Sequence, residues 1–221
     1  MEFLTLEGVG FAYPRKSPLL RDISFSLRAD DTVALMGPNG SGKTTLGKIM
    51  VGILPVSAGR IRLDKQDIAA YRLSEIGRRI GYVFQNPAKQ LFCSSAAEEV
   101  SFGLAGRGWT AAAARERSRE LLEQFELTDC AQEFPLNLSR GEQQRLAIAA
   151  ALALEPKFLI LDEPTTGLDK VRKQILAETL LRLRESGVGY LLISHDAAFC
   201  RQCTGRTLFL REGGSHWRES K

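Results

Sequence analysis

Residues 32–44 read Thr-Val-Ala-Leu-Met-Gly-Pro-Asn-Gly-Ser-Gly-Lys-Thr, and this stretch decides the fold of the 221-residue chain. Residues 32–36 predict a short, wholly buried strand, and a helix is expected to begin at about Gly42. Residues 37–44 match the phosphate-binding loop pattern, and they lie between a strand and a helix, the context that this pattern requires. The stretch therefore predicts an α/β domain that binds phosphate groups.

The residue types in this loop suit phosphate binding. Glycines allow successive backbone N–H groups to face the phosphates, and the helix N-terminus adds positive potential. Lys43 is expected to neutralise the β- and γ-phosphates of a nucleotide, and the Thr44 hydroxyl to hold Mg²⁺. The alternative is a glycine turn beside a solvated lysine. The predicted nucleotide-binding residues of this segment are Asn39, Gly40, Ser41, Gly42, Lys43, Thr44 and Thr45.

A second motif lies further along the chain, where the apolar residues 158–161 are followed by Asp162 and Glu163. The two acids are expected at the carboxyl end of a buried strand, where ligands bind in open α/β sheets. Asp162 is predicted to complete the Mg²⁺ shell through water, and Glu163 to accept a proton from an attacking water. The alternative is that acids end this strand for solubility alone.

The rest of the chain alternates predicted strands and helices, which indicates a largely parallel sheet covered by helices. An antiparallel layer is expected to precede it, because residues 3–6 and 23–27 have the pattern of half-buried strands. Further strands are predicted at residues 80–84, 190–194 and 207–210, and helices at 138–154 and 169–185. Helical periodicity interrupts the alternation between Pro87 and about Phe134, with Thr110 as the N-cap of one helix.

The composition is that of an ordinary globular protein, with 44% hydrophobic and 25% charged residues and a net charge of +4. The basic residues are scattered apart from a small cluster at Arg115, Arg117 and Arg119. A solvated helix face explains that cluster better than a nucleic-acid surface does. We therefore expect no nucleic-acid partner.

The sequence also bears on cellular location. No apolar stretch reaches the roughly 20 residues that span a bilayer, and residues 1–6 lack the basic start and apolar block of a secretory signal. The expected location is therefore the cytoplasm. The four cysteines are expected to be reduced and without a metal, because the pair Cys200 and Cys203 has no second pair at zinc-finger spacing.

Residues 138–146, Leu-Ser-Arg-Gly-Glu-Gln-Gln-Arg-Leu, stand shortly before the carboxylate strand. This segment resembles the signature motif of ATP-binding cassette (ABC) ATPases, and the order of the motifs from Leu138 through Glu163 to Asp169 is that of the family. The resemblance implies that Ser139 and Gly141 present backbone N–H groups to the γ-phosphate of a nucleotide held by another subunit. A dimer of ABC ATPase subunits is therefore expected. A capping box formed by Ser139 and Glu142 is the alternative reading, and the two roles can coexist.

The resemblance also implies a fold and a division of the chain. We expect one ABC ATPase domain, residues 1–221, with a RecA-like P-loop core at about 1–86 and 155–221 and a helical subdomain at about 87–154. The expected fold class is α/β, with a mostly parallel sheet, an N-terminal antiparallel β layer and the inserted helical subdomain.

Four further residues match positions of the family pattern, and the implied cofactors are ATP and Mg²⁺. Tyr13 matches the aromatic residue that stacks on adenine, although it could be a core aromatic. Gln85 matches the glutamine that reaches Mg²⁺ and the reactive water, and a simple turn glutamine is the alternative. His195 matches the histidine that hydrogen-bonds the γ-phosphate, rather than being a chance surface histidine. Asp169 matches the loop that crosses between subunits, and it could also cap its own helix.

The chain departs from the family pattern at two places. Arg140 stands where many members have glycine, so that a side chain lies beside the expected position of the partner's phosphate. This side chain either points away from the phosphate or adds a positive contact to it. Residues 165–169, Thr-Thr-Gly-Leu-Asp, differ from the commonest Ser-Ala-Leu-Asp form.

Residues 83–92 and 98–103 look like those of the ATPase subunits of energy-coupling-factor (ECF) importers. In that family this region contacts a helix of the membrane protein, and Pro87, Leu91 and Phe92 offer an apolar patch for it. The resemblance implies an ATP-hydrolysing subunit of an importer of a vitamin or metal ion, peripheral on the inner face of the cell membrane. A transmembrane subunit is expected to bind at residues 85–102. The alternatives are the ATPase of another ABC importer or exporter, or a soluble or non-hydrolysing regulatory ABC module.

Overall fold

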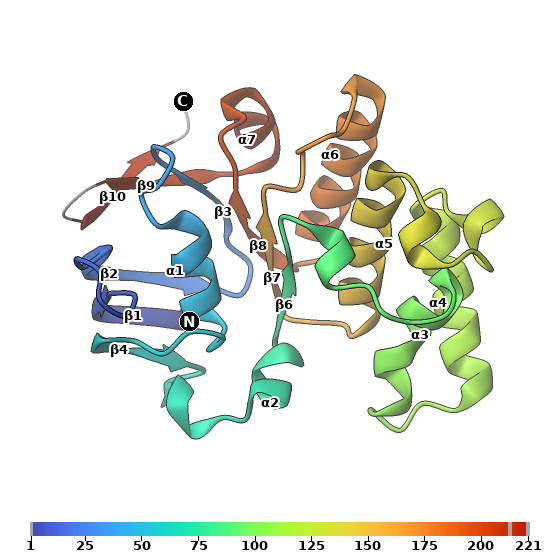
Figure 1. Ribbon diagram of the computed structural model, residues 1–221, viewed down its shortest axis with the longest axis horizontal. Coiled ribbons are helices and arrows are strands. Elements are labelled where there is room, and N and C mark those ends of the chain that lie inside the picture. Colours follow the sequence, from blue (N-terminus) through green and yellow to red (C-terminus); the bar gives the residue numbers. More distant parts are fainter. Residues whose placement is uncertain (1, 212–213, 220–221) are drawn as a thin grey trace.

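The computed structural model describes residues 2–211 and 214–219 and contains two β-sheets with helices between and around them (Figure 1). The smaller sheet is antiparallel and has the strand order β2-β1-β4-β5. Its strands are β1 (Glu2–Phe11), β2 (Leu20–Arg28), β4 (Ala58–Leu63) and β5 (Gln66–Asp67). In β2 the buried Ile23, Phe25 and Leu27 alternate with more exposed residues, which is the pattern of a sheet with one buried face.

The larger sheet has the strand order β10-β9-β3-β8-β7-β6. Among the described residues it is parallel except for β10, which pairs with β9 in the antiparallel sense. Its central strands β7 and β8 are completely buried, which explains why their sequences are nearly continuous apolar runs. The strands are β3 (Thr32–Met36), β6 (Ile80–Val83), β7 (Phe158–Asp162), β8 (Gly189–Ile193), β9 (Arg206–Arg211) and β10 (Gly214–Glu219).

Helix α1 (Lys43–Met50) lies between the two sheets (Figure 1). Its buried Leu46 and Ile49 share one hydrophobic cluster with the smaller sheet and with Ile193 of the larger sheet. The opposite face of the larger sheet packs against α5 (Arg140–Ala153) and α6 (Lys170–Glu185). The larger sheet is thus covered on both faces, as expected for parallel strands.

The helices between β6 and β7 form the group on one side of the molecule in Figure 1. Helix α3 (Ala96–Ala105) packs against α4 (Ala111–Gln124), and the Thr110 hydroxyl accepts a hydrogen bond from the N–H of Ala113 as the predicted N-cap. The buried Arg145 of α5 donates from Nε to the carbonyl of Phe125 at 2.8 Å, which ties α5 to the end of α4. Helix α5 therefore connects this helical group with the sheet.

Several elements lie where the periodicity predicts them, and others were not predicted. Helix α5 begins two residues after the expected start, with Ser139 as its N-cap, and β8 begins and ends one residue early. The sequence analysis missed β4, β5, β10, α2 (Leu73–Gly77) and α7 (Ala197–Cys203). Helix α2 and helix α7 have only five and seven residues, too few for a helical period to stand out. Short 3₁₀ helices cover Ile68–Ala70, Pro87–Lys89, Thr128–Cys130 and Pro135–Asn137.

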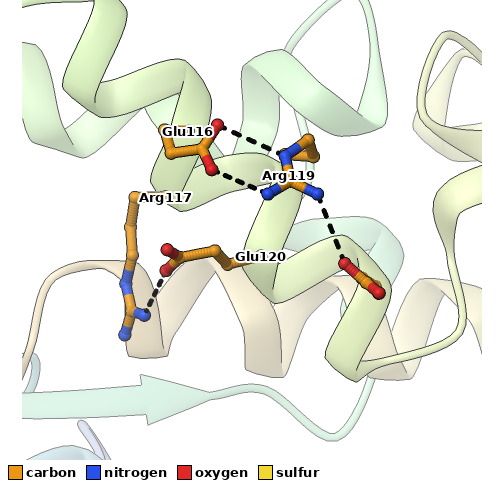
Figure 2. A network of polar contacts seen from close by, with 5 residues as sticks. Glu116, Arg117, Arg119 and Glu120 are labelled. Carbon is orange, nitrogen blue, oxygen red and sulfur yellow. Dashed lines mark hydrogen bonds and ion pairs between the residues drawn. The ribbon is translucent and has the colours of Figure 1, made fainter.

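The outer face of α4 carries the arginine cluster noted in the sequence. Arg119 forms ion pairs with Glu116 at 2.7 Å and with Glu123 at 3.4 Å, and Arg117 pairs with Glu120 at 3.1 Å (Figure 2). These pairs lie three or four residues apart on an exposed helix, so they contribute little to stability. Because acidic neighbours neutralise two of the three arginines, this face has the character of a solvated helix surface.

The cysteines are free thiols in the described part of the chain. Burial raises the pKa of both Cys200 and Cys203 to about 12, so these thiols stay protonated and unreactive. Within residues 2–211 and 214–219, no helix combines the length and the apolar character that crossing a membrane requires.

Candidate functional site

A cavity of about 580 Å³ opens at the carboxyl ends of the central parallel strands. It is formed by the loop after β3, the start of α1 and the residues that follow β6, β7 and β8, which is where α/β sheets bind ligands. Nine of the sequence-predicted residues line it together with Leu19, which was not predicted. The predicted ones are Asn39, Gly40, Gly42, Lys43, Thr44, Thr45, Gln85, Glu163 and His195.

The loop of residues 37–42 owes its shape to glycine. Gly40 and Gly42 have φ angles of 80° and 95°, in the left-handed region that favours glycine. At Gly37 a β-carbon would lie 2.2 Å from the carbonyl oxygen of Leu210, so a side chain would push the loop away from β9. The loop can therefore stay close to the sheet and direct backbone groups toward the cavity.

Lys43 is held beneath this loop and is 8% exposed. Its ammonium group donates to the carbonyl oxygens of Gly37 at 2.9 Å and of Pro38 at 3.0 Å. Helix α1 begins beside it with Gly42 as N-cap, without a side-chain cap and without an acidic residue in its first turn. The N–H groups at this helix end are thus left for a ligand, and the lysine adds a full positive charge beside them.

Ser41 supplies a separate indication that a ligand belongs in the loop. Its hydroxyl oxygen is buried and has no hydrogen-bond partner among the described residues. Buried polar atoms are normally satisfied, because an unpaired one loses its bonds to water without compensation. A phosphate oxygen would supply the missing partner.

Asp162 lies at the end of β7 and is 1% exposed. One of its carboxylate oxygens accepts a hydrogen bond from the Thr44 hydroxyl at 3.0 Å, and the other accepts one from the Tyr82 hydroxyl at 3.1 Å. Burial raises the pKa of Asp162 above its ordinary value, while the two hydrogen bonds act in the opposite direction. The two motifs predicted to share a metal therefore meet in the structure, and their hydroxyl and carboxylate oxygens are the ligand types that Mg²⁺ prefers.

Tyr82 was missed by the sequence analysis. It lies in β6, the neighbour of β7, where its ring also contacts Phe84 edge-on. Burial raises the pKa of its hydroxyl, which therefore stays protonated and donates to Asp162. The one signal in the sequence was a tyrosine near the carboxyl end of an otherwise apolar strand.

Glu163 follows Asp162 and adopts a φ angle of 49°, which is rare for a residue other than glycine. Its N–H donates to the carbonyl of Ile193 at 2.8 Å, so β8 holds the turned backbone in place. The residue is 8% exposed. Such a conformation persists only where the surroundings fix it, and it occurs often at active sites.

His195 comes directly after Ser194 and reaches Glu163 across the cavity. Its Nδ1 lies 2.9 Å from Oε2 of Glu163, an ion-pair distance when the imidazole is protonated. This Oε2 is buried and has no hydrogen-bond partner among the described residues. The imidazole itself is mostly exposed, with 70% of the side chain accessible. Both side chains line the cavity, where they contact each other.

The loop that carries His195 is fixed by its neighbour Asp196. One oxygen of Asp196 caps α7 by accepting from the N–H of Phe199 at 3.0 Å, and the other pairs with the ammonium of Lys173 on α6 at 2.7 Å. The hydrogen bond from Lys173 is the main cause that lowers the pKa of Asp196. An ion pair and a helix cap thus anchor the residue next to the histidine.

This arrangement predicts a pH-dependent loss of stability in Asp196→Asn. Asparagine also caps helices, so the variant mainly removes the pair with Lys173, and we expect it to lose about 0.5 to 1 kcal/mol at pH 7. Because the folded-state pKa of Asp196 lies below the unfolded one, its carboxylate stabilises the fold above the unfolded pKa and loses this effect as the pH falls. Urea unfolding of variant and wild type should therefore differ at pH 7 and converge as the pH falls below the folded-state pKa of Asp196. Asp129→Asn, at an exposed site, is the control and should show no such convergence.

Gln85 is exposed at the cavity and stands two residues after the end of β6. Gln90 stabilises the loop that carries Gln85. Its side-chain amide accepts from the N–H of Phe84 at 3.1 Å and donates to the carbonyl of Tyr82 at 3.2 Å. The sequence analysis did not single out Gln90, since a contact to residues six and eight positions earlier leaves no periodic signal.

Tyr13 lies at the edge of the site rather than among the residues that line the cavity. Its hydroxyl is 3.1 Å from the hydroxyl of Thr45, and its ring packs edge-on against Phe11 with centroids 4.8 Å apart. The side chain is 37% exposed. The stacking role expected for Tyr13 stays a prediction.

Ser139, Gly141 and Asp169 are absent from the residues that line the cavity, and they form a second cluster. Ser139 and Glu142 make the capping box, in which the Ser139 N–H donates to Glu142 Oε2 at 2.8 Å and the Ser139 hydroxyl accepts from the Glu142 N–H at 3.4 Å. Asp169 caps α6 by accepting from the Arg172 N–H at 2.8 Å. A β-carbon on Gly141 would lie 3.4 Å from Leu168 Cδ2, so the two helix starts are neighbours.

Comparison with known proteins shows the family. Residues 20–166 match the sequence profile of the family described as ABC transporter. The energy-coupling factor transporter ATP-binding protein EcfA of Methanothermobacter thermautotrophicus is 36% identical over 95% of this chain and 68% of its own length.

Two solved structures share the fold over the whole chain. CbiO1 of Clostridium perfringens, part of the ABC transporter complex CbiONQ, has a TM-score of 0.87 and 30% identity over 100% of this chain and 89% of its own. The ATP-binding cassette MJ0796, a dimer in a post-hydrolysis state with ADP and Pi, has a TM-score of 0.89 and 27% identity over 99% of both chains. The fold, the cavity and these matches together show that the chain belongs to the ABC transporter ATP-binding family and is an ABC ATPase.

Proposed function

We propose that this chain binds and hydrolyses ATP in the cavity at the ends of β3, β6, β7 and β8, and that a second ABC ATPase subunit completes the site. The observation that carries the proposal is the meeting of Lys43, the Thr44–Asp162 pair, Glu163 and His195 around one cavity. Ser139, Gly141 and Asp169 do not line that cavity, which supports a role toward the nucleotide of a second subunit.

The phosphates of ATP are bound at the start of α1. The phosphate oxygens accept hydrogen bonds from the uncapped N–H groups of the helix, the Ser41 hydroxyl and the backbone N–H groups of the loop glycines. Lys43 exchanges its two backbone carbonyl partners for the β- and γ-phosphates. The rest of the cavity wall beside the phosphates is formed by Asn39, Gly40 and Thr45. The ring of Tyr13 stacks on the adenine.

Thr44 and Gln85 would hold Mg²⁺, and Asp162 would complete its shell through water. The fit rests on the 3.0 Å contact between Thr44 and Asp162 and on the oxygen chemistry of all three side chains. When bound, Mg²⁺ neutralises charge on the β- and γ-phosphate oxygens. Tyr82 keeps the Asp162 carboxylate oriented.

Glu163 orients the attacking water and accepts its proton while the water oxygen bonds to the γ-phosphorus and the bond to the bridging oxygen breaks. His195 donates a hydrogen bond to the γ-phosphate and thereby sets the direction of attack. Glu163 is buried and its backbone is held at a positive φ angle, so its carboxylate has little conformational freedom. The carboxylate therefore accepts the proton at a fixed position.

A second subunit supplies the remaining contacts. Its Ser139 and Gly141 N–H groups face the γ-phosphate, and its Asp169 loop crosses the interface. The dimeric state of MJ0796 with ADP and Pi supports this arrangement. Closure of the dimer excludes water from the cavity and strengthens each electrostatic contact.

The transmembrane partner binds at residues 85–102. Of the predicted apolar patch only Phe92 is exposed, because Pro87 and Leu91 are buried. A groove of about 310 Å³ takes its place, and its lining includes Leu73, Phe84, Phe92 and Phe102. Phe92 and Phe102 are 65% and 58% exposed and pack edge-on with ring centroids 5.0 Å apart. Exposed aromatic pairs at a groove are typical of a helix-binding surface. The chain would then lie on the inner face of the cell membrane.

The names of EcfA and of the CbiONQ complex support an ECF-type importer of a vitamin or metal ion. The apolar groove fits equally a helix of another ABC importer or exporter, which is the alternative. Co-purification from detergent-solubilised membranes identifies the partner and separates the two.

Replacing both groove aromatics, Phe92→Ser with Phe102→Ser, should separate membrane coupling from catalysis. The variant is expected to lose its membrane partner on affinity purification, while its ATP binding stays within about twofold, because neither ring lines the nucleotide cavity. Phe134→Ser is the matched control, since Phe134 is 43% exposed but does not line the groove. Retention of the membrane partner by the double variant would contradict this assignment.

A further inference from the structure

The two places where the chain departs from the ABC pattern contact each other. Arg140 is the first residue of α5, and Gly167 lies in the loop that precedes α6. A β-carbon built on Gly167 would lie 3.1 Å from Arg140 Cδ, 3.3 Å from Nε and 3.8 Å from Cγ. The stem of Arg140 therefore fills the space that a side chain at position 167 would need.

A reciprocal contact joins the same two segments. A β-carbon on Gly141, the residue after Arg140, would lie 3.1 Å from Arg172 Cδ and 3.4 Å from its Nε. Arg172 in turn forms an ion pair with Asp169. Each segment thus offers a glycine on which the arginine of the other segment lies, and both segments belong to the second cluster described above.

The helix itself gives no reason for an arginine at this place. A cation in the first turn of a helix faces the positive end of the helix dipole, which is unfavourable. Gly167 has a φ angle of 81°, so its loop adopts a conformation that other residues rarely take. The packing of the arginine stem on this glycine is the compensating contact.

We propose that Arg140 is a positioning residue, which acts through its aliphatic stem on Gly167 and so fixes the loop that carries Asp169. Its side chain lies along its own subunit, and phosphate of the partner's nucleotide is not its target. The functional part of this inference rests on the proposed function, because the loop matters for turnover only where two subunits share the nucleotide.

A double-mutant cycle in the 221-residue chain tests the proposal. The variants are Arg140→Gly, Gly167→Ala and both together, assayed for steady-state ATP turnover and for urea unfolding. Gly167→Ala should lower turnover about tenfold beside Arg140 but only about twofold beside glycine, with KM for ATP unchanged. The strain of alanine at a positive φ is present in both backgrounds and cancels. Equal costs in both backgrounds, in turnover and in unfolding, would overturn the proposal.

Arg140→Met separates the stem from the charge, because methionine keeps an unbranched side chain and carries no charge. Turnover should stay within about twofold of wild type, whereas Arg140→Gly should lose about fivefold. Arg119→Met on the outer face of α4 is the matched control and should not change turnover. A loss in Arg140→Met as large as that in Arg140→Gly would overturn the proposal and indicate a charge contact to phosphate.

Urea unfolding and ATP turnover test this inference and the proposed function separately. Urea unfolding reports the Arg140–Gly167 contact without any nucleotide, so additive unfolding energies contradict the inference whatever the turnover. An absence of ATP turnover in the wild-type dimer, with the cycle still non-additive in unfolding, would instead contradict the proposed function.

Discussion

Replacing Glu163 with glutamine is expected to leave ATP binding intact and to lower the rate of hydrolysis by about 10² to 10⁴. Glutamine keeps the shape of the side chain but cannot accept the proton of the attacking water. The residue is 8% exposed and its backbone is held by the carbonyl of Ile193, so the amide should occupy the place of the carboxylate. Steady-state phosphate release and equilibrium binding of MgATP to the same preparation measure the two effects separately.

Glu126→Gln provides a matched control, because Glu126 also has a positive φ angle, 55°, but does not line the cavity. It should hydrolyse ATP at the wild-type rate. Unchanged turnover in Glu163→Gln would remove Glu163 from the role of base, and it would favour a module that uses ATP for dimerisation alone. A loss of binding equal to the loss of turnover would assign the residue to binding instead.

Replacing Lys43 with alanine should weaken ATP binding itself, by roughly 10² or more, because truncating one partner of a buried charged contact costs about 2 to 5 kcal/mol. Lys43 is buried beneath the loop and is the residue whose charge faces the expected phosphates. Lys43→Met keeps most of the stem and should show nearly the same loss, since the charge carries the effect. Isothermal titration with MgATP measures it.

The control for this experiment is Lys16→Ala, at an exposed position outside the cavity. Lys43 also donates to two carbonyls of its own loop, so the loop could loosen in the variant. Urea unfolding of Lys43→Ala and Lys43→Met shows whether this happens. Wild-type affinity in a folded Lys43→Ala variant would contradict the phosphate-binding role of the loop.

Much of the larger sheet could be predicted because its strands are short apolar runs that end in polar residues. Residues 158–161 and 32–36 are such runs, and they form β7 and β3. Strand β4 was missed although Arg60, Ile61, Arg62 and Leu63 alternate in polarity, because two arginines dominate a run of six residues. The ion pairs of Arg60 and Arg62 with Glu7 of β1 explain why charged residues suit this exposed face.

The cavity residues were predictable for a related reason. Lys43, Gln85, Glu163 and His195 each follow a buried strand, and the carboxyl ends of parallel strands meet at one edge. Tyr82 and Gln90 could not be found in this way. Tyr82 becomes a neighbour of Asp162 only when β6 pairs with β7, and Gln90 reaches the backbone of Phe84 and Tyr82 only when its own loop folds back.

The direction of the Arg140 side chain was also beyond the sequence. Both alternatives, away from phosphate or toward it, were compatible with its position at the start of a helix. The structure places its stem on Gly167, 27 positions later in the chain, and thereby favours the first alternative. Gly167 has no side chain, and this absence leaves the space in which the Arg140 stem lies.

Strand pairing sets the relative position of Glu163 and His195, whose side chains contact each other at the cavity. Asp162 pairs with Ile193, and Glu163 and His195 are one and two positions beyond this last rung. The central strands of the sheet therefore fix where these two residues lie, and motion of the surface loops should not change their relative position. An inserted residue between Ile193 and His195 would displace the histidine permanently, and natural or engineered length variation at this junction should be selected against far more strongly than at the turn between α3 and α4.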